Sequence, residues 1–159
     1  MTPDILEATL AAEITTIFTG YTLKNSDEAA VALNVFVHDI PVIQGDDEGD
    51  SEAPPPEPYI VVKATSGNIA SEDDPQAVTV VLVICVFDDA NERQGHKDIL
   101  HIIQKVYERF AKNPVLAGKF VLKYPIDWVL QDEDTYPYYF GGMQLLFECH
   151  AIKKEDPLA

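Results

Sequence analysis

Basic residues are scarce in this sequence. Its 159 residues contain 11 Lys and Arg against 27 Asp and Glu, which gives a formal net charge of -16. A field of this sign repels the phosphates of nucleic acids and of anionic lipids, so it argues against a protein that grips DNA or a membrane surface. It suits a surface that DNA must pass without sticking.

Cysteines and long apolar runs are also rare. The two cysteines, Cys85 and Cys149, both lie in apolar patterns, which is typical of reduced core thiols in a cytosolic protein. No apolar run approaches the ~18 residues of a membrane span, and no basic segment followed by an apolar one opens the chain. We therefore expect neither secretion nor membrane spanning.

Catalytic and metal-binding motifs are absent as well. The sequence has no G-x-S-x-G, P-loop, H-E-x-x-H or C-x-x-C. His96 and His101 would point about 140° apart on a helix and cannot share an ion. His150 alternates with Cys149, which disfavours a thiol-imidazole pair, and the acids at 132–134 are typical of a solvated turn. The prediction is a protein that is not an enzyme and needs no cofactor or metal.

The most apolar segment is residues 76–88, QAVTVVLVICVFD, and it predicts one long strand. Because side chains alternate along a strand, Val81, Val83 and Phe87 share one apolar face and Leu82 and Ile84 share the other. Two apolar faces indicate an interior strand of a sheet, with a cover needed on each side. Replacing Val83 or Phe87 with Asp is therefore expected to destabilise the fold by several kcal/mol.

Two helices are predicted around this strand. Residues 95–112 carry apolar side chains at the spacing of a helical stripe and end at Asn113-Pro114. Residues 3–19 begin with Pro3 and are followed by Gly20, a common helix end. The helix at 95–112 packs on one face of the strand, and the other face still lacks a cover. The helix at 3–19 is a candidate cover for one face of the sheet.

Further strands are predicted at 31–38, 58–64, 119–124, 126–131 and 138–152, with turns at 67–75 and 132–134. The order of helix, strands, helix and strands argues for one α+β domain over residues 1–159. Its fold class is a mostly antiparallel sheet of four to five strands with two main helices packed on it. Residues 153–159 read as a polar tail.

Residues 45–58 form an acidic, proline-rich segment that contains six acids and four prolines. Such a composition predicts a mobile loop that buries nothing. A calcium loop is the alternative, but the acids lack the D-x-[DN]-x-[DN]-G spacing with a distal Glu.

The C-terminal half resembles a known family over roughly residues 59–152. The residues that carry the resemblance are, in order, Asp88-Asp89 after the long strand, Gly95 at the helix start, 120–122 with Pro125-Ile126, the acidic turn, YPYYFGGM at 136–143 and LLFE at 145–148. This order resembles the tail terminator (tail completion) proteins of long-tailed bacteriophages and the related terminators of phage-derived contractile particles. The acidic loop does not map onto that family.

The resemblance implies a structural protein of virion assembly, located in the tail or neck of the virion and assembled in the bacterial host cytoplasm. Terminators form hexameric rings on the last ring of the tail tube, end its polymerisation, and present a surface to the head-side connector protein. Expected partners are further copies of the chain, the tail tube protein and the connector, with DNA passing through without specific binding. No membrane partner is expected.

The same resemblance suggests which residues make contacts. The candidate subunit or tube interface is apolar and aromatic, and comprises Tyr136, Tyr138, Tyr139, Phe140, Val81, Val83 and Phe87. The alternative is that the aromatics pack on their own subunit and that Gly141-Gly142 is a bulge. The acids of the loop, Asp46, Asp47, Glu48, Asp50 and Glu52, are expected to face the lumen or the tube unless the loop is an inert surface segment.

Two other functions stay open at this point. One is a head-closure or adaptor protein of the same neck. The other is an acidic module that mimics DNA, which should carry acids along exposed helix or strand faces. Here the acids concentrate in turns and one loop, which counts against mimicry.

Overall fold

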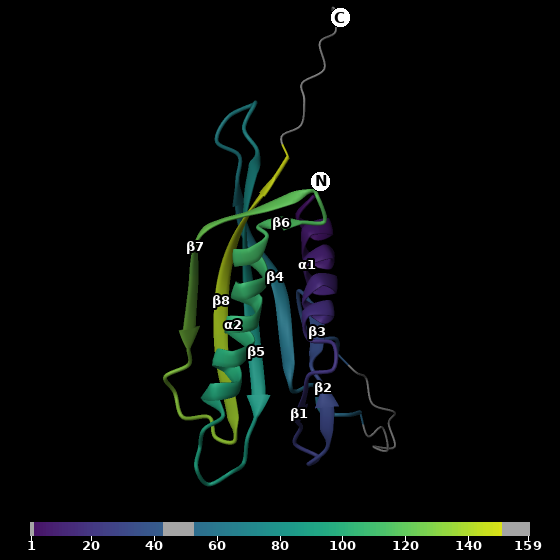
Figure 1. The fold of residues 1–159 in the computed structure, drawn as a ribbon, viewed down its shortest axis with the longest axis vertical. Helices are drawn as coiled ribbons and strands as arrows, with labels where there is room; N and C mark the ends of the chain where they lie inside the picture. The colour runs from purple at the N-terminus through teal and green to yellow at the C-terminus, as the bar shows by residue number, and fades with distance from the viewer. Residues whose placement is uncertain (1, 43–52, 151–159) are drawn as a thin grey trace, which may run out of the picture.

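The computed structural model describes residues 2–42 and 53–150, and these form an α+β fold. Figure 1 shows two helices on a long, curled sheet, with a small hairpin at one end. The helices are α1 (Pro3–Ile17) and α2 (His96–Lys112). The strands are β1 (Thr22–Lys24), β2 (Ala30–Ala32), β3 (Asn34–Val37), β4 (Tyr59–Asn68), β5 (Gln76–Phe87), β6 (Val115–Leu116), β7 (Phe120–Leu130) and β8 (Tyr138–Cys149).

The main sheet has six strands in the order β3-β4-β5-β8-β7-β6, and β1 pairs with β2 in a separate two-stranded sheet. Every pairing is antiparallel except that of β3 with β4. The long strand β5 lies between β4 and β8, as its two apolar faces predict. The α+β class and the antiparallel character are confirmed, whereas the expected count of four to five strands is too low.

The count is higher because the short strand β6 was not predicted, and β1 of the small sheet was not predicted either. Two predicted strands are also divided differently in the structure. The expected strand at 31–38 is two strands: β2 pairs with β1, and β3 pairs with β4. A regular alternation over so few residues does not reveal that the partner changes at Leu33. The expected pair of strands around Pro125 is instead the single strand β7, whose register shifts between Lys123 and Asp127.

Both helices lie on the same face of the sheet. α1 contacts β3 and β4, and α2 contacts β5, β7 and β8. The side chains of β5 that point toward the helices are all buried, namely Val78, Val80, Leu82, Ile84 and Val86. The predicted stripe of α2 is confirmed at Ile99, Ile103, Val106 and Phe110, and Ile102 is buried with them.

Helix α2 lies close to β8 because a glycine leaves room for it. A Cβ placed on Gly141 would lie only 2.3 Å from Cγ2 of Ile99. Any larger residue at this position would force the Ile99 side chain or the helix to shift. Phe110 and Phe147 complete the contact with ring centroids 5.6 Å apart.

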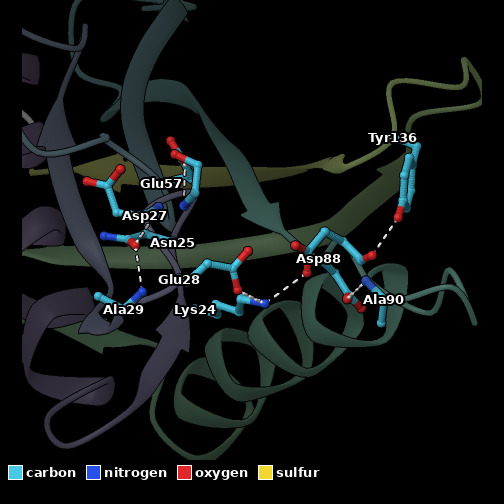
Figure 2. A network of polar contacts seen from close by, with 11 residues as sticks. Lys24, Asn25, Asp27, Glu28, Ala29, Glu57, Asp88, Ala90 and Tyr136 are labelled. Atoms are coloured by element: carbon cyan, nitrogen blue, oxygen red, sulfur yellow. Dashed lines mark hydrogen bonds and ion pairs between the residues drawn. The ribbon is translucent and has the colours of Figure 1, made fainter.

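The acidic segment lies only partly within the described residues. Its candidate acids at 46–52 are outside them, as is the tail at 153–159. The expectation that the segment buries nothing is wrong at its C-terminal end, where Glu57 is 4% exposed. Glu57 Oε1 accepts a hydrogen bond from the Ser26 N–H at 3.2 Å, which satisfies a backbone donor in the β1–β2 turn (Figure 2).

Within residues 2–42 and 53–150, no helix has the length and hydropathy needed to cross a membrane.

Candidate functional site

The face of the sheet opposite the helices is apolar, and within the described residues no helix covers it. One row of aligned residues crosses five strands: Phe36, Val61, Val83, Gly142 and Val129. The rows beside it contain further apolar side chains. We call this surface the open face; it comprises the row above together with Tyr59, Val81, Cys85, Phe87, Tyr138, Phe140 and Leu146.

The centre of the open face lacks a side chain at Gly142, and we call this gap the hollow. A Cβ on Gly142 would lie 3.5 Å from Val129 Cγ1 and 3.6 Å from the Leu82 carbonyl oxygen, both ordinary contact distances. The subunit itself therefore has room for a side chain at Gly142, in contrast to Gly141. Both glycines pair in regular register with β5, so the alternative of a bulge is wrong.

Charged residues border the open face in pairs. Lys63 lies 3.9 Å from Asp39, and Lys123 lies 3.6 Å from Glu148. Many of the exposed acids of the described chain instead occupy turns, among them residues 72–74 and 132–134. Asp127 of β7 lies opposite Gln144 on the same face and is also exposed. The open face thus carries two ion pairs and one further carboxylate, on a chain whose net charge is -16.

Five of the seven predicted interface residues lie together on the open face. Val81, Val83 and Phe140 are half-buried and keep part of their surface accessible. Phe87 is only 8% exposed, because its ring packs edge-on against Tyr138 at 5.6 Å and the Lys24 amine lies over it. Phe87 therefore has little surface to offer to another molecule.

Tyr139 points to the opposite face of the sheet. Its ring packs on the start of α2, where a Cβ on Gly95 would lie 2.3 Å from Tyr139 Cδ2. The structure thus accounts for Tyr139 by packing within its own subunit.

Tyr136 is held in the turn between β7 and β8. Its hydroxyl donates a hydrogen bond to the Asp89 carbonyl oxygen at 2.5 Å, and the Arg93 guanidinium lies 4.9 Å from the ring centroid. Figure 2 shows the hydroxyl of Tyr136 directed at the loop that follows β5. The role of Tyr136 within the subunit is to tie this turn to that loop.

The β1–β2 hairpin is fastened to the same loop by an ion pair (Figure 2). Lys24 Nζ lies 2.9 Å from Asp89 Oδ1 and also contacts the Glu28 carboxylate. These contacts raise the pKa of Lys24 and lower that of Asp89. The Asp88 N–H donates to the Pro137 carbonyl oxygen at 2.9 Å, so three chain segments meet at this end of the open face.

The two thiols are not poised for chemistry. Burial raises the pKa of Cys85 to about 12 and also raises the pKa of Cys149. Thiols in this state stay protonated near neutral pH and are poor nucleophiles. In the part of the chain that the structure describes, no three His, Cys, Asp or Glu side chains are grouped so that they could hold a metal ion.

Sequence reasoning missed the exposed aromatic residues beside α2. Tyr124 and Trp128 are well exposed on β7, and Tyr107 is exposed on the facing side of the helix. Trp128 does share a face with Ile126 and Leu130, as the alternation predicts. The sequence could have indicated this exposure, because it contains no further apolar helix that would cover Tyr124 and Trp128.

Neither the protein-family models nor the curated proteins contain a match to this sequence.

Proposed function

We propose that this protein is a structural virion assembly protein of the tail terminator type. In this proposal, copies of the chain form a ring of six on the end of the tail tube, stop its growth, and join it to the head-side connector. The observation that carries the proposal is the open face: a largely apolar surface that no helix covers within the described part of a strongly acidic chain.

The charge of the chain supports self-association through this face in particular. Two copies of net charge -16 repel each other wherever their acidic turns approach. The centre of the open face carries Val81, Val83, Phe140 and Leu146, and the exposed carboxylate of Asp127 lies toward its edge, on β7. Contact there removes apolar area from water, at about 25 cal/mol per Å², without bringing like charges together.

The placement of the acids supports a passage for DNA. The exposed acids at 72–74 lie beyond one end of β5, and those at 132–134 lie beside its other end. A ring whose axis runs along β5 carries this negative charge at its two mouths, and DNA phosphates do not adhere to surfaces of the same sign.

Substitution of Val83 by Asp tests the proposal. A charge at the centre of the open face should leave the subunit folded and abolish its assembly, as measured by size exclusion with light scattering and by electron microscopy of tail tubes. Ser71→Asp is the matched control, because it adds the same charge to an exposed turn away from the face. Wild-type protein that neither assembles nor binds tube ends at high concentration, or a Val83→Asp variant that assembles normally, would overturn it.

The alternatives predict different results in the same assays. A head-closure or adaptor protein would bind the connector but not the free end of the tube. A module that mimics DNA would stay a monomer or dimer and would compete with DNA for a DNA-binding protein.

A further inference from the structure

A second apolar surface lies on the helix side of β7. Tyr124 and Trp128 are 61% and 56% exposed, and Tyr107 of α2 is 39% exposed. Together with Ile103 and Ile126 they line a groove of about 240 Å³ between the helix and the strand. We call this surface, comprising Ile103, Tyr107, Tyr124, Ile126 and Trp128, the β7 rim.

The strand that carries the β7 rim is an open edge. β6 pairs only with Phe120 and Val121, so the outer side of β7 from Lys123 to Leu130 has no neighbouring strand in the described residues. Exposed edges are usually protected by charged side chains, particularly lysine. Lys123 and Asp127 flank the register shift in this stretch. Beyond it, Trp128 projects from one face and Val129, 64% exposed, projects from the other.

The β7 rim and the open face lie on opposite sides of the same sheet. Val129 belongs to the central row of the open face, whereas Trp128 pairs with Met143, whose side chain is buried beneath α2. Two apolar surfaces that face in different directions cannot both be covered by one two-fold contact between like surfaces. A contact of one with the other is heterologous, and such a contact repeats around a closed ring or along an open filament.

The size and charge of the β7 rim fit another copy of this chain. At roughly 200 Å² for each fully exposed ring, the three aromatics offer about 300 Å², more than a third of the ~800 Å² that a stable interface buries per partner. The polar residue of the groove is Gln104, so no carboxylate lines it. The groove itself therefore brings no carboxylate toward a second copy of this acidic chain.

We propose that the β7 rim of one copy packs on the open face of the next, with Trp128 over the hollow at Gly142. This inference rests on the proposed ring, for which it supplies the second surface. Trp and Tyr are the residues that most often anchor such contacts, and an aromatic ring needs a partner surface that is locally recessed. Gly142 provides that recess, and its own subunit does not require the missing side chain.

Mixing two variants tests the pairing. Trp128→Glu damages only the β7 rim, and Val83→Asp damages only the open face. Each variant alone is expected to be a folded monomer by circular dichroism and light scattering. Their equimolar mixture is expected to form a dimer of twice the subunit mass, because each contributes the surface that the other lacks. Ile5→Glu, which adds the same charge to an exposed apolar residue of α1, should assemble as the wild type does.

Three results would overturn the inference in distinguishable ways. If Trp128→Glu assembles normally while Val83→Asp does not, the open face is used but the β7 rim is not, and the proposed function survives. If both variants are monomers and the mixture stays monomeric, the two surfaces do not bind each other. If Val83→Asp assembles normally, or the wild type itself never assembles, the proposed function fails together with the inference.

Discussion

The carboxylate of Glu7, in α1, accepts a hydrogen bond from the backbone N–H of Ala64, in β4, across 3.1 Å. β3 ends opposite Val62, so at Ala64 it no longer provides a backbone acceptor for β4. The register between β4 and β5 also shifts just after Ala64. His38 Nδ1 lies 2.9 Å from the same carboxylate oxygen. The Glu7 carboxylate thus takes the place of the backbone acceptor that β3 no longer provides. This contact holds α1 on the sheet together with the apolar side chains of the helix.

Replacing Glu7 with Ala should therefore destabilise the fold. The Ala64 N–H would lose its acceptor at a partly buried site, at a cost of about 1–3 kcal/mol in the free energy of unfolding. Glu7→Gln keeps an oxygen acceptor and should cost clearly less. Urea titration followed by circular dichroism measures both. Equal losses for the two variants would mean that the hydrogen bond is not the source of the stability.

The two glycines of β8 should respond differently to substitution. Gly141→Ala forces its new methyl group against Ile99, and overpacking of this kind costs about 1–3 kcal/mol. Gly142→Ala meets only ordinary contacts and should change stability by no more than about 0.5 kcal/mol. Thermal melts of both variants check this. If Gly142→Ala were as unstable as Gly141→Ala, the fold of the subunit itself would require a glycine at position 142.

Asp substitutions at Val83 and at Phe87 should differ in how much they destabilise the fold. The sequence pattern predicts a large loss for both, because it places them on one apolar face. In the structure Phe87 is buried against Tyr138, so Phe87→Asp should cost about 3–5 kcal/mol. Val83 is half-buried on the open face, so the Val83→Asp monomer should lose much less. Comparable unfolding midpoints for the two variants would contradict this reading.

The stability of the fold should decrease in alkaline solution because of Cys85. Burial raises the pKa of its thiol from the ordinary 9.0 to about 12, so the folded state holds this proton more tightly than the unfolded state does. This contribution is complete below the unfolded pKa and is lost as the pH rises toward the folded one. Between about pH 9 and pH 12 the thiol should reduce the free energy of unfolding by about 1.4 kcal/mol per pH unit. Cys85→Ala should flatten that part of the plot of unfolding free energy against pH. If the slope is unchanged in the variant, other groups cause the loss of stability.

The sequence predicts most of the elements because their signals are local. The thirteen-residue run that contains β5 and the apolar stripe of α2 need no knowledge of the rest of the chain. The partner of β3 and the contact of Gly141 with Ile99 depend on segments far apart in the sequence, and local patterns do not carry that information. The buried Glu57 is hidden for the same reason, since its acidic and proline-rich surroundings indicate solvent.

The candidate surface was predictable in part. Alternation along β5 places Val81 and Val83 on one face, and in the structure this is the face that no helix covers. Alternation also separates Tyr139 from Tyr138 and Phe140, but the four aromatics at 136–140 read as one cluster in the sequence. The structure shows that neighbouring tyrosines serve different contacts: Tyr139 supports α2, and Tyr136 supports a loop.

The twelve residues of β5 span about 40 Å, and acidic turns lie at both ends of this distance. In the proposed ring, both ends of the channel then carry negative charge. The sign of the charge alone therefore does not determine which end binds the tail tube. What differs between the mouths is the aromatic turn at Tyr136 and Arg93, which is present at one end only of the described chain. We therefore expect the shape and chemistry of that turn to determine which end of the ring binds the tube.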